Sequence, residues 1–419
     1  MEHKIRDHFN DPVGLESLYR SDRKGFRLAF LRVLPEIEDQ SLAAFWKARL
    51  DSEHDNALSP DVSTWEILVL LLAAISAGVL IKAPELFGFN KEFTLFYERN
   101  AALIVFFGLT LYTVLLKEIR TTKHIVFTAM VFMVSAVYIN FLPAGSQSHS
   151  ITLAYIHLPL MLWCLYGLVF TDFDLGSKSR RIEYIRHNGD LAVMGAIVLI
   201  AGGLMTGITL GLFSAIEVDI EKFYVEYIVI WGLVSAPIVV SFILQKYPLI
   251  TSRIAPVIAR VFSPLVLLTL IIYLGSIIFS GKDPYNDREF LLVFNLLLLG
   301  VMAIIIFSVP ETSVARRQRF NEFILLGLAL LTLIIDLVAL SAIIYRLGEF
   351  GFSPNRTVVL GSNLLIFGNM LLVLIDLFNV VFGKMDIRKV EQTIAAYVPL
   401  YLGWTVFVVF VLPWVFGLR

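Results

Sequence analysis

The sequence is poor in the residues that build disulfides, metal sites and nucleotide sites. Its 419 residues include a single cysteine, Cys164, which excludes an internal disulfide framework. No clustered His and Cys ligands suggest a conventional zinc site, and no Gly-x-x-x-x-Gly-Lys-Ser/Thr segment suggests an ATP-driven motor. We therefore expect a chain without a metal or another cofactor.

Charge is scarce as well. Charged residues make up 16% of the chain, hydrophobic residues 58%, and the net charge of −1 argues against a nucleic acid partner. The mean hydropathy of +0.78 exceeds what a soluble protein of this length could bury, so membrane lipid is the expected partner. The N-terminus, MEHKIRDHFND, is too polar for a signal peptide, so the first apolar segment is expected to be a retained helix.

Long apolar stretches separated by short polar breaks dominate the chain from residue 61 to residue 419. Each has roughly the 20 residues that a helix needs to cross a bilayer, and helices satisfy their own backbone in lipid. The sequence therefore predicts an all-α polytopic bundle of about eleven transmembrane helices. They are expected at residues 64–82, 101–117, 124–142, 151–171, 190–213, 225–245, 262–280, 289–309, 322–345, 357–381 and 394–416.

Positive charge alternates between the loops and so predicts an orientation. Every second loop carries at least three Lys or Arg: Lys117, Arg120 and Lys123; Lys178, Arg180, Arg181 and Arg186; Lys246, Arg253 and Arg260; Arg316, Arg317 and Arg319; Lys384, Arg388 and Lys389. By the positive-inside rule these loops are cytoplasmic, so the N-terminus is cytoplasmic and Arg419 lies outside. Residues 246–261 could instead form an interfacial helix, because ITSRIAPVIAR mixes apolar and basic residues.

Residues 1–60 are expected to form a separate cytoplasmic helical element. Apolar residues recur there at helical spacing. The two faces comprise Phe26, Phe30, Val33 and Leu34, and Leu42, Phe45, Trp46 and Leu50. Together they could bury a small helical hairpin, which could also dock a protein partner.

Of the acids within the predicted spans, two lie farthest from the span ends. Asp336 and Asp376 would each cost at least about 2.5 kcal/mol near the bilayer centre, so each needs water, a partner or a proton. Ser362, Asn369 and Asp376 recur every seven residues on an otherwise apolar helix. Asn295 and Asn363 lie nearer the outer surface, so these side chains could form a polar ladder that binds an ion or a substrate. Alternatively, Asp336 hydrogen-bonds to Asn363 or Asn369 and only holds helices together.

The loop YRLGEFGFSPNRTVV adds two external arginines, Arg346 and Arg356, which could bind a phosphate or carboxylate. Residues 346–356 resemble the Arg-x-x-x-Tyr-Gly-Leu-Thr-Pro-x-Arg segment of a bacterial family of multi-pass membrane proteins known only as a domain of unknown function. Phe350 stands for the tyrosine, and Phe352-Ser353 for Leu-Thr. The resemblance implies a bacterial cytoplasmic membrane and supplies no activity.

Three functions from different classes remain open. A proton-coupled or cation-coupled transporter or flippase would use the acids of the ninth and tenth spans. A scaffold or assembly subunit would use the N-terminal element for docking and would catalyse nothing. A membrane-embedded transferase acting on a lipid-linked substrate would use external carboxylates, for which the candidates are Glu217, Asp219, Glu221, Asp283, Asp287 and Glu349. The sequence does not specify the substrate or the oligomeric state.

Glycines four residues apart indicate one further packing feature. Gly203 and Gly207 share a face of the fifth predicted span, where a neighbouring helix could approach closely.

Overall fold

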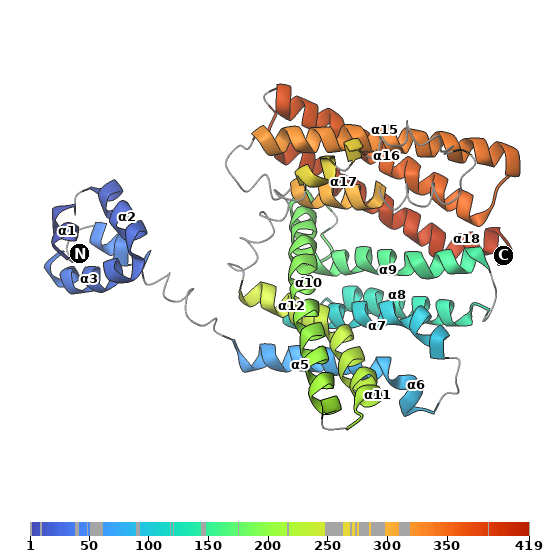
Figure 1. Cartoon of the computed structure of the whole chain (residues 1–419), viewed down its shortest axis with the longest axis horizontal. Coiled ribbons are helices and arrows are strands. Elements are labelled where there is room, and N and C mark those ends of the chain that lie inside the picture. Colours follow the sequence, from blue (N-terminus) through green and yellow to red (C-terminus); the bar gives the residue numbers. More distant parts are fainter. Residues whose placement is uncertain are drawn as a thin grey trace. The chain divides into compact units, whose positions relative to one another are not determined.

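The computed structural model describes most of the chain and divides it into two compact units, Met1–Ser63 and Thr64–Arg419 (Figure 1). The described residues are 2–8, 11–37, 42–47, 49–50, 62–88, 93–117, 119, 121–143, 148–174, 176–215, 218–247, 263–268, 270–272, 275, 285, 298–309, 319–383 and 385–418.

The first unit is a small helical fold with its own apolar core. It contains α1 (Glu2–Asp7), α2 (Pro12–Ser21), α3 (Arg23–Ile37) and a further helical segment at 42–47. Phe26, Phe30 and Trp46 are at most 2% exposed, as the helical spacing predicts. Phe45 was expected on the buried face, but 57% of it is exposed. It lies next to Trp46, so only one of these two neighbouring side chains can face the core.

The second unit is an all-α polytopic membrane bundle. Its long helices are α5 (Thr64–Ile81), α7 (Phe93–Leu116), α8 (Thr122–Phe141), α9 (His149–Phe170), α10 (Lys178–Ala215), α12 (Ile230–Lys246), α15 (Arg319–Phe350), α16 (Pro354–Phe382) and α17 (Arg388–Val406). Shorter pieces are α6 (Ala83–Leu86), α11 (Glu221–Phe223), the π-helices η1 (Tyr224–Val229) and η2 (Phe407–Val411), and α18 (Leu412–Val415).

Nine predicted spans coincide with helices that are long and apolar enough to cross a membrane, counting only the described residues. The predicted seventh and eighth spans, 262–280 and 289–309, are only partly described. Shorter apolar helices, Ser263–Ile272 and Leu298–Val309, lie within them. Most of the segment 246–261, for which an interfacial helix was an alternative, also lies outside the described residues.

Polar contacts define two ends of the bundle. At one, called here the Lys117 end, Lys117 lies 3.4 Å from Asp172. The same end holds an ion pair between Lys246 Nζ and Glu66 Oε2 at 2.5 Å. At the other, called here the Arg99 end, Arg99 Nε donates to the Tyr155 hydroxyl at 3.0 Å. Each contact joins chain segments that the loop charges assign to the same side of the membrane.

Contacts in the second half of the unit fall at the same two ends. Arg186 pairs with Glu391 at 2.7 Å near the Lys117 end, and the Tyr138 hydroxyl donates to the Phe410 carbonyl at 3.4 Å near the Arg99 end. The rings of Phe323 and Phe382 lie 5.9 Å apart, which places the start of α15 beside the end of α16, at the Lys117 end. Lys246 and the start of α15 thus lie at the same end of the bundle, as the two spans predicted between them would require.

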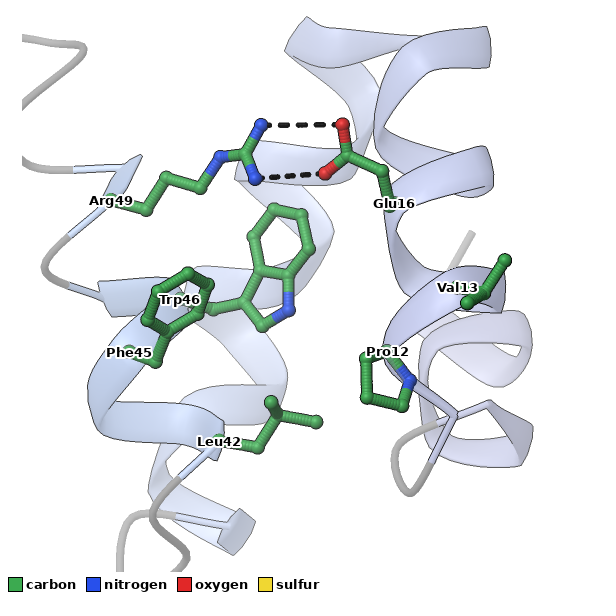
Figure 2. A pocket seen from close by; sticks show the side chains of 7 residues that line it. All are labelled: Pro12, Val13, Glu16, Leu42, Phe45, Trp46 and Arg49. Carbon is green, nitrogen blue, oxygen red and sulfur yellow. Dashed lines mark hydrogen bonds and ion pairs between the residues drawn. The ribbon is translucent and has the colours of Figure 1, made fainter.

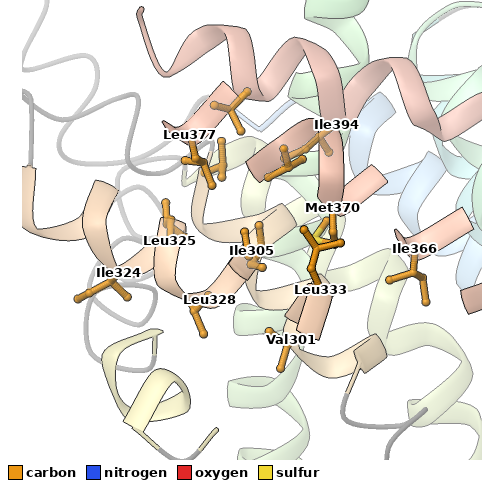
Figure 3. Packing of buried hydrophobic residues seen from close by; sticks show 14 of the residues in the cluster. Val301, Ile305, Ile324, Leu325, Leu328, Leu333, Ile366, Met370, Leu377 and Ile394 are labelled. Carbon is orange, nitrogen blue, oxygen red and sulfur yellow. The ribbon is translucent and has the colours of Figure 1, made fainter. Parts of the chain in front are cut away.

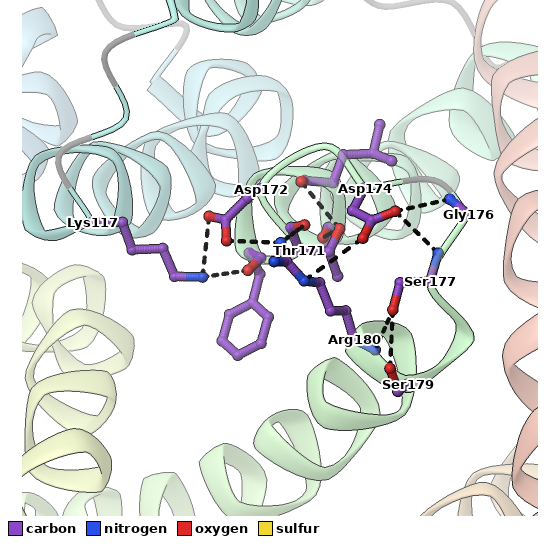
Figure 4. A network of polar contacts seen from close by, with 11 residues as sticks. Lys117, Thr171, Asp172, Asp174, Gly176, Ser177, Ser179 and Arg180 are labelled. Atoms are coloured by element: carbon purple, nitrogen blue, oxygen red, sulfur yellow. Dashed lines mark hydrogen bonds and ion pairs between the residues drawn. The ribbon is translucent and has the colours of Figure 1, made fainter.

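A turn with two left-handed residues joins α9 to α10 at the Lys117 end (Figure 4). Asp172 and Phe173 have φ values of 54° and 60°, which are uncommon for residues with a side chain. Lys117 Nζ donates to the Phe170 carbonyl at 2.5 Å, and Arg180 Nη1 donates to Asp172 Oδ2 at 3.0 Å. Asp174 accepts backbone N–H groups of the following residues. Two of the basic residues that predict orientation are therefore neutralised locally and stabilise this turn.

The largest apolar cluster surrounds α15, α16 and α17, which lie side by side (Figures 1 and 3). Leu328, Met370 and Leu377 are fully buried there, and Val301 and Ile305 of the shorter apolar helix pack against them. Both intramembrane acids lie on this group of helices, Asp336 on α15 and Asp376 on α16.

Glycines of α16 make room for aromatic side chains of α17. A Cβ placed at Gly361 would lie 2.0 Å from the Trp404 ring, and one at Gly368 would lie 2.4 Å from the Tyr397 hydroxyl. Both pairs are seven residues apart on their helices, so the two antiparallel surfaces match. In contrast, no described atom lies within 4 Å of a Cβ at Gly203 or Gly207. The close approach predicted at those two positions is therefore not seen in the described chain.

Candidate functional site

Asp336 lies at the centre of the α15–α16–α17 cluster. Its side chain is fully buried, and neither carboxylate oxygen has a hydrogen-bond partner among the described residues. The alternative in which Asp336 bonds to Asn363 or Asn369 is therefore not what the structure shows. A lone carboxylate in such surroundings must hold a proton or meet a cation, because an uncompensated buried charge is very costly.

Tyr401 of α17 is hydrogen-bonded to Asn369 of α16 and lies near Asp336. The Tyr401 hydroxyl lies within electrostatic range of Asp336 and accepts a hydrogen bond from Asn369 Nδ2 at 2.7 Å. That hydroxyl in turn donates to Met302 Sδ at 3.5 Å. Asn369 is fully buried, and its Oδ1 has no partner in the described part of the chain. The site thus comprises the side chains of Asp336, Asn369 and Tyr401. The oxygens of Asp336 and Asn369 accept no hydrogen bond from a described residue.

The polar stripe on α16 faces α17. Trp404 Nε1 donates to Ser362 Oγ at 3.0 Å, and Thr393 Oγ1 donates to Asp376 Oδ2 at 2.5 Å. With the contact between Asn369 and Tyr401, every member of this seven-residue repeat has a partner on the same neighbouring helix. Ser362 and Asp376 have their acceptor satisfied and act as links between helices, whereas Asn369 Oδ1 has no partner among the described residues.

The other predicted binding residues are placed apart from Asp336. Asn363 is 2% exposed and lies on α16, nearer the Arg99 end. Arg356 donates to the carbonyls of Phe350 and Gly351 at 2.9 and 2.6 Å, so it closes the turn between α15 and α16. Arg346 is partly exposed, ten residues from Asp336 and so roughly 15 Å along α15. Asn295 lies outside the described residues.

The carboxylates expected for a transferase are only partly described. Glu217, Asp283 and Asp287 fall outside the described residues. Asp219 Oδ1 accepts the backbone N–H of Glu221 at 3.0 Å and so begins α11, and Glu349 is exposed. Within the described ranges no group of three His, Cys, Asp or Glu side chains could hold a metal ion.

Sequence reasoning did not single out Tyr401, although a signal was available. It follows Tyr397 by four residues and precedes Trp404 by three, so an aromatic face runs along α17. Comparison of the chain with protein-family models, curated proteins and solved structures found no match. The chemistry of the site therefore rests on its own geometry.

Proposed function

We propose that this membrane protein is a proton-coupled transporter in which Asp336 binds and releases the coupling proton. The observation that carries the proposal is the fully buried Asp336 carboxylate without a partner in the described chain. Intramembrane acids of this kind mark ion pathways and proton relays. Tyr401 and Asn369 supply a hydroxyl and an amide that can stabilise the charged form while the proton is away.

A proton fits this site better than a hard metal cation. Calcium and magnesium take about six or more oxygen ligands. The described neighbourhood offers the Asp336 carboxylate, Asn369 Oδ1 and the Tyr401 hydroxyl, which also contacts the Met302 thioether. The remaining walls are aliphatic side chains of the surrounding core. A cation-coupled mechanism remains the second form of the proposal.

The proposed location is a bacterial cytoplasmic membrane with the Lys117 end in the cytoplasm. The positive-inside rule supports that orientation, which places the N-terminus inside and residue 419 outside. The resemblance of residues 346–356 to a bacterial family supports the choice of membrane.

Charge displacement after a pH jump tests the proposal without knowledge of the substrate. Wild-type protein would be reconstituted into liposomes, adsorbed on a solid-supported electrode and exposed to a rapid acidification. Because a proton enters a buried site, we expect a transient current in wild type and at least a tenfold smaller one in Asp336→Asn, roughly the loss expected of an essential ion-binding group.

Asp376→Asn is the matched control, because Asp376 is bonded to Thr393 and shares the helix bundle. It should keep the wild-type current. The same jump made with sodium ions at constant pH separates the two forms of the proposal. Currents that survive in Asp336→Asn, or that are absent from a folded wild type, would refute a role of Asp336 in coupling.

A scaffold is the second candidate, and a groove on the N-terminal unit favours it (Figure 2). The groove has a volume of about 510 Å³ and includes the exposed side chains of Val13 and Phe45. Arg49 spans its edge in a two-pronged ion pair with Glu16, with Nη1 to Oε2 at 2.8 Å. Arg49 also lies 4.9 Å from the Trp46 ring centre. An apolar groove with a polar edge suits a helical peptide of a partner protein.

A further inference from the structure

An apolar groove opens on the surface of the second unit between α7 and α12. Its volume is about 370 Å³, and its lining residues are Ile81, Tyr97, Ala101, Val105, Ile230, Leu233 and Val234. Tyr97, Ala101 and Val105 follow one another at four-residue spacing, so they form one wall along α7. That wall runs for about 12 Å along the helix axis, a length that suits part of an acyl chain.

Unequal helix packing produces the groove. A Cβ at Gly78 would lie 1.9 Å from the Trp231 ring, and a Cβ at Gly108 would lie 2.7 Å from Ile238, so α12 packs tightly against α5 and α7 at these points. Towards the Arg99 end, α12 continues into the π-helix η1. Such wider turns are rare and frequently occur at functional sites.

A polar cluster stands at the Arg99 end of the groove. Lys82 is 3% exposed, and its Nζ pairs with Glu85 Oε1 at 2.7 Å and lies 4.6 Å from the Tyr227 ring centre. The Tyr227 hydroxyl hydrogen-bonds to the same glutamate. Tyr97, which lines the groove, is within electrostatic range of both Glu85 and Glu226. Ile81 lines the groove and Lys82 follows it in sequence, so the cluster borders the groove.

Glu226 leaves this cluster with an excess negative charge. It is half-buried on η1, and it forms no ion pair with a described residue. Because Lys82 and Glu85 neutralise each other, the remaining carboxylate is complementary to a cation. An ammonium group could donate hydrogen bonds to Glu226 and to the Tyr97 hydroxyl while an apolar tail lies in the groove below.

We propose that this site binds a phospholipid whose headgroup carries a primary ammonium, such as an ethanolamine lipid. The acyl chain occupies the groove along α7, and the ammonium group binds Glu226. A quaternary headgroup lacks N–H donors, and an anionic headgroup is repelled by the same carboxylate. This lipid site is separate from Asp336 and does not depend on the transport proposal.

Native mass spectrometry of the full chain tests the site. Purified protein would be titrated with ethanolamine, choline and glycerol phospholipids that share the same two acyl chains. We expect the ethanolamine lipid to bind about tenfold more tightly than either competitor, the ratio expected for one charge-assisted hydrogen bond. Glu226→Gln should reduce its affinity to that of the choline lipid.

Two further variants keep the test decisive. Glu98→Gln changes an exposed acid next to Tyr97 and should bind like wild type. Ala101→Phe fills the groove and should weaken the ethanolamine lipid even where Glu226 is intact. Equal affinity for all three lipids would overturn the proposal, and so would an ethanolamine preference that survives both Glu226→Gln and Ala101→Phe.

Discussion

Replacing Arg99 with methionine is expected to destabilise the protein by roughly 2–4 kcal/mol, because two backbone carbonyls lose their donor. Arg99 is 9% exposed and uses all three guanidinium nitrogens. Besides Tyr155, it donates to the carbonyls of Asn140 and Leu142 at 3.2 and 3.0 Å. Asn140 lies in the last turn of α8 and Leu142 is its C-cap residue, so the helix itself supplies no N–H partner for these carbonyls.

The effect should be large because methionine matches the length of arginine but donates nothing. Each buried carbonyl left without a donor costs about 1–3 kcal/mol. The measurement is the free energy of unfolding in mixed micelles, followed by circular dichroism as denaturing detergent is added. Lys389→Met removes an exposed charge near the start of α17 and should change that free energy by no more than about 0.5 kcal/mol. Equal losses in the two variants would contradict the role assigned to Arg99.

Gly361→Ala is expected to cost about 1–3 kcal/mol through overpacking, although alanine is the better helix former. The added methyl group would lie 2.0 Å from Cη2 of Trp404, so that the indole must move. Movement of the indole would weaken its hydrogen bond to Ser362. It would also shift α17 at Trp404, which lies about one turn from Tyr401. We therefore expect a lower unfolding free energy and a weaker pH-jump current in the same variant.

Gly403→Ala provides the matched control on the facing helix. No described atom lies within 4 Å of a Cβ at this position, and its neighbour Trp404 is the residue that Gly361 accommodates. The same methyl group should here be neutral or stabilising by up to about 1 kcal/mol. A Gly361→Ala variant as stable as Gly403→Ala would show that α16 and α17 do not pack through this glycine.

Hydrophobic length predicts this fold well because lipid imposes a single requirement. A stretch of apolar residues long enough to cross the bilayer must be helical, so the nine long helices in the described part of the chain are readable from composition alone. Loop charge also predicts which segments share an end of the bundle, as the pair of Lys246 with Glu66 illustrates. Contacts between helices are harder to predict, because they depend on which glycine lies against a large side chain of a neighbouring helix. Gly361 meets Trp404, whereas Gly203 meets no described residue.

The sequence predicts the acid of the candidate site, but it does not predict the residues that surround that acid. Asp336 stands out because a carboxylate is expensive among Leu, Ile and Val. Its neighbour Tyr401 is sixty-five residues away in sequence, and tyrosine is common in membrane helices near the interface, so only its aromatic spacing with Tyr397 and Trp404 indicated it. Arg356 illustrates the opposite case. An external arginine suggests an anion site, but its guanidinium is occupied by the carbonyls of the adjacent turn.

Infrared difference spectroscopy of the reconstituted protein tests most directly whether Asp336 exchanges a proton. Spectra would be recorded as the buffer is stepped between acidic and alkaline pH, within the range where the helical signal is unchanged. We expect a carbonyl band of a protonated, dry carboxylic acid that disappears at alkaline pH in wild type and in Asp376→Asn, and that is missing in Asp336→Asn. A band that is present in wild type at every pH, or that persists in Asp336→Asn, would contradict proton exchange at Asp336.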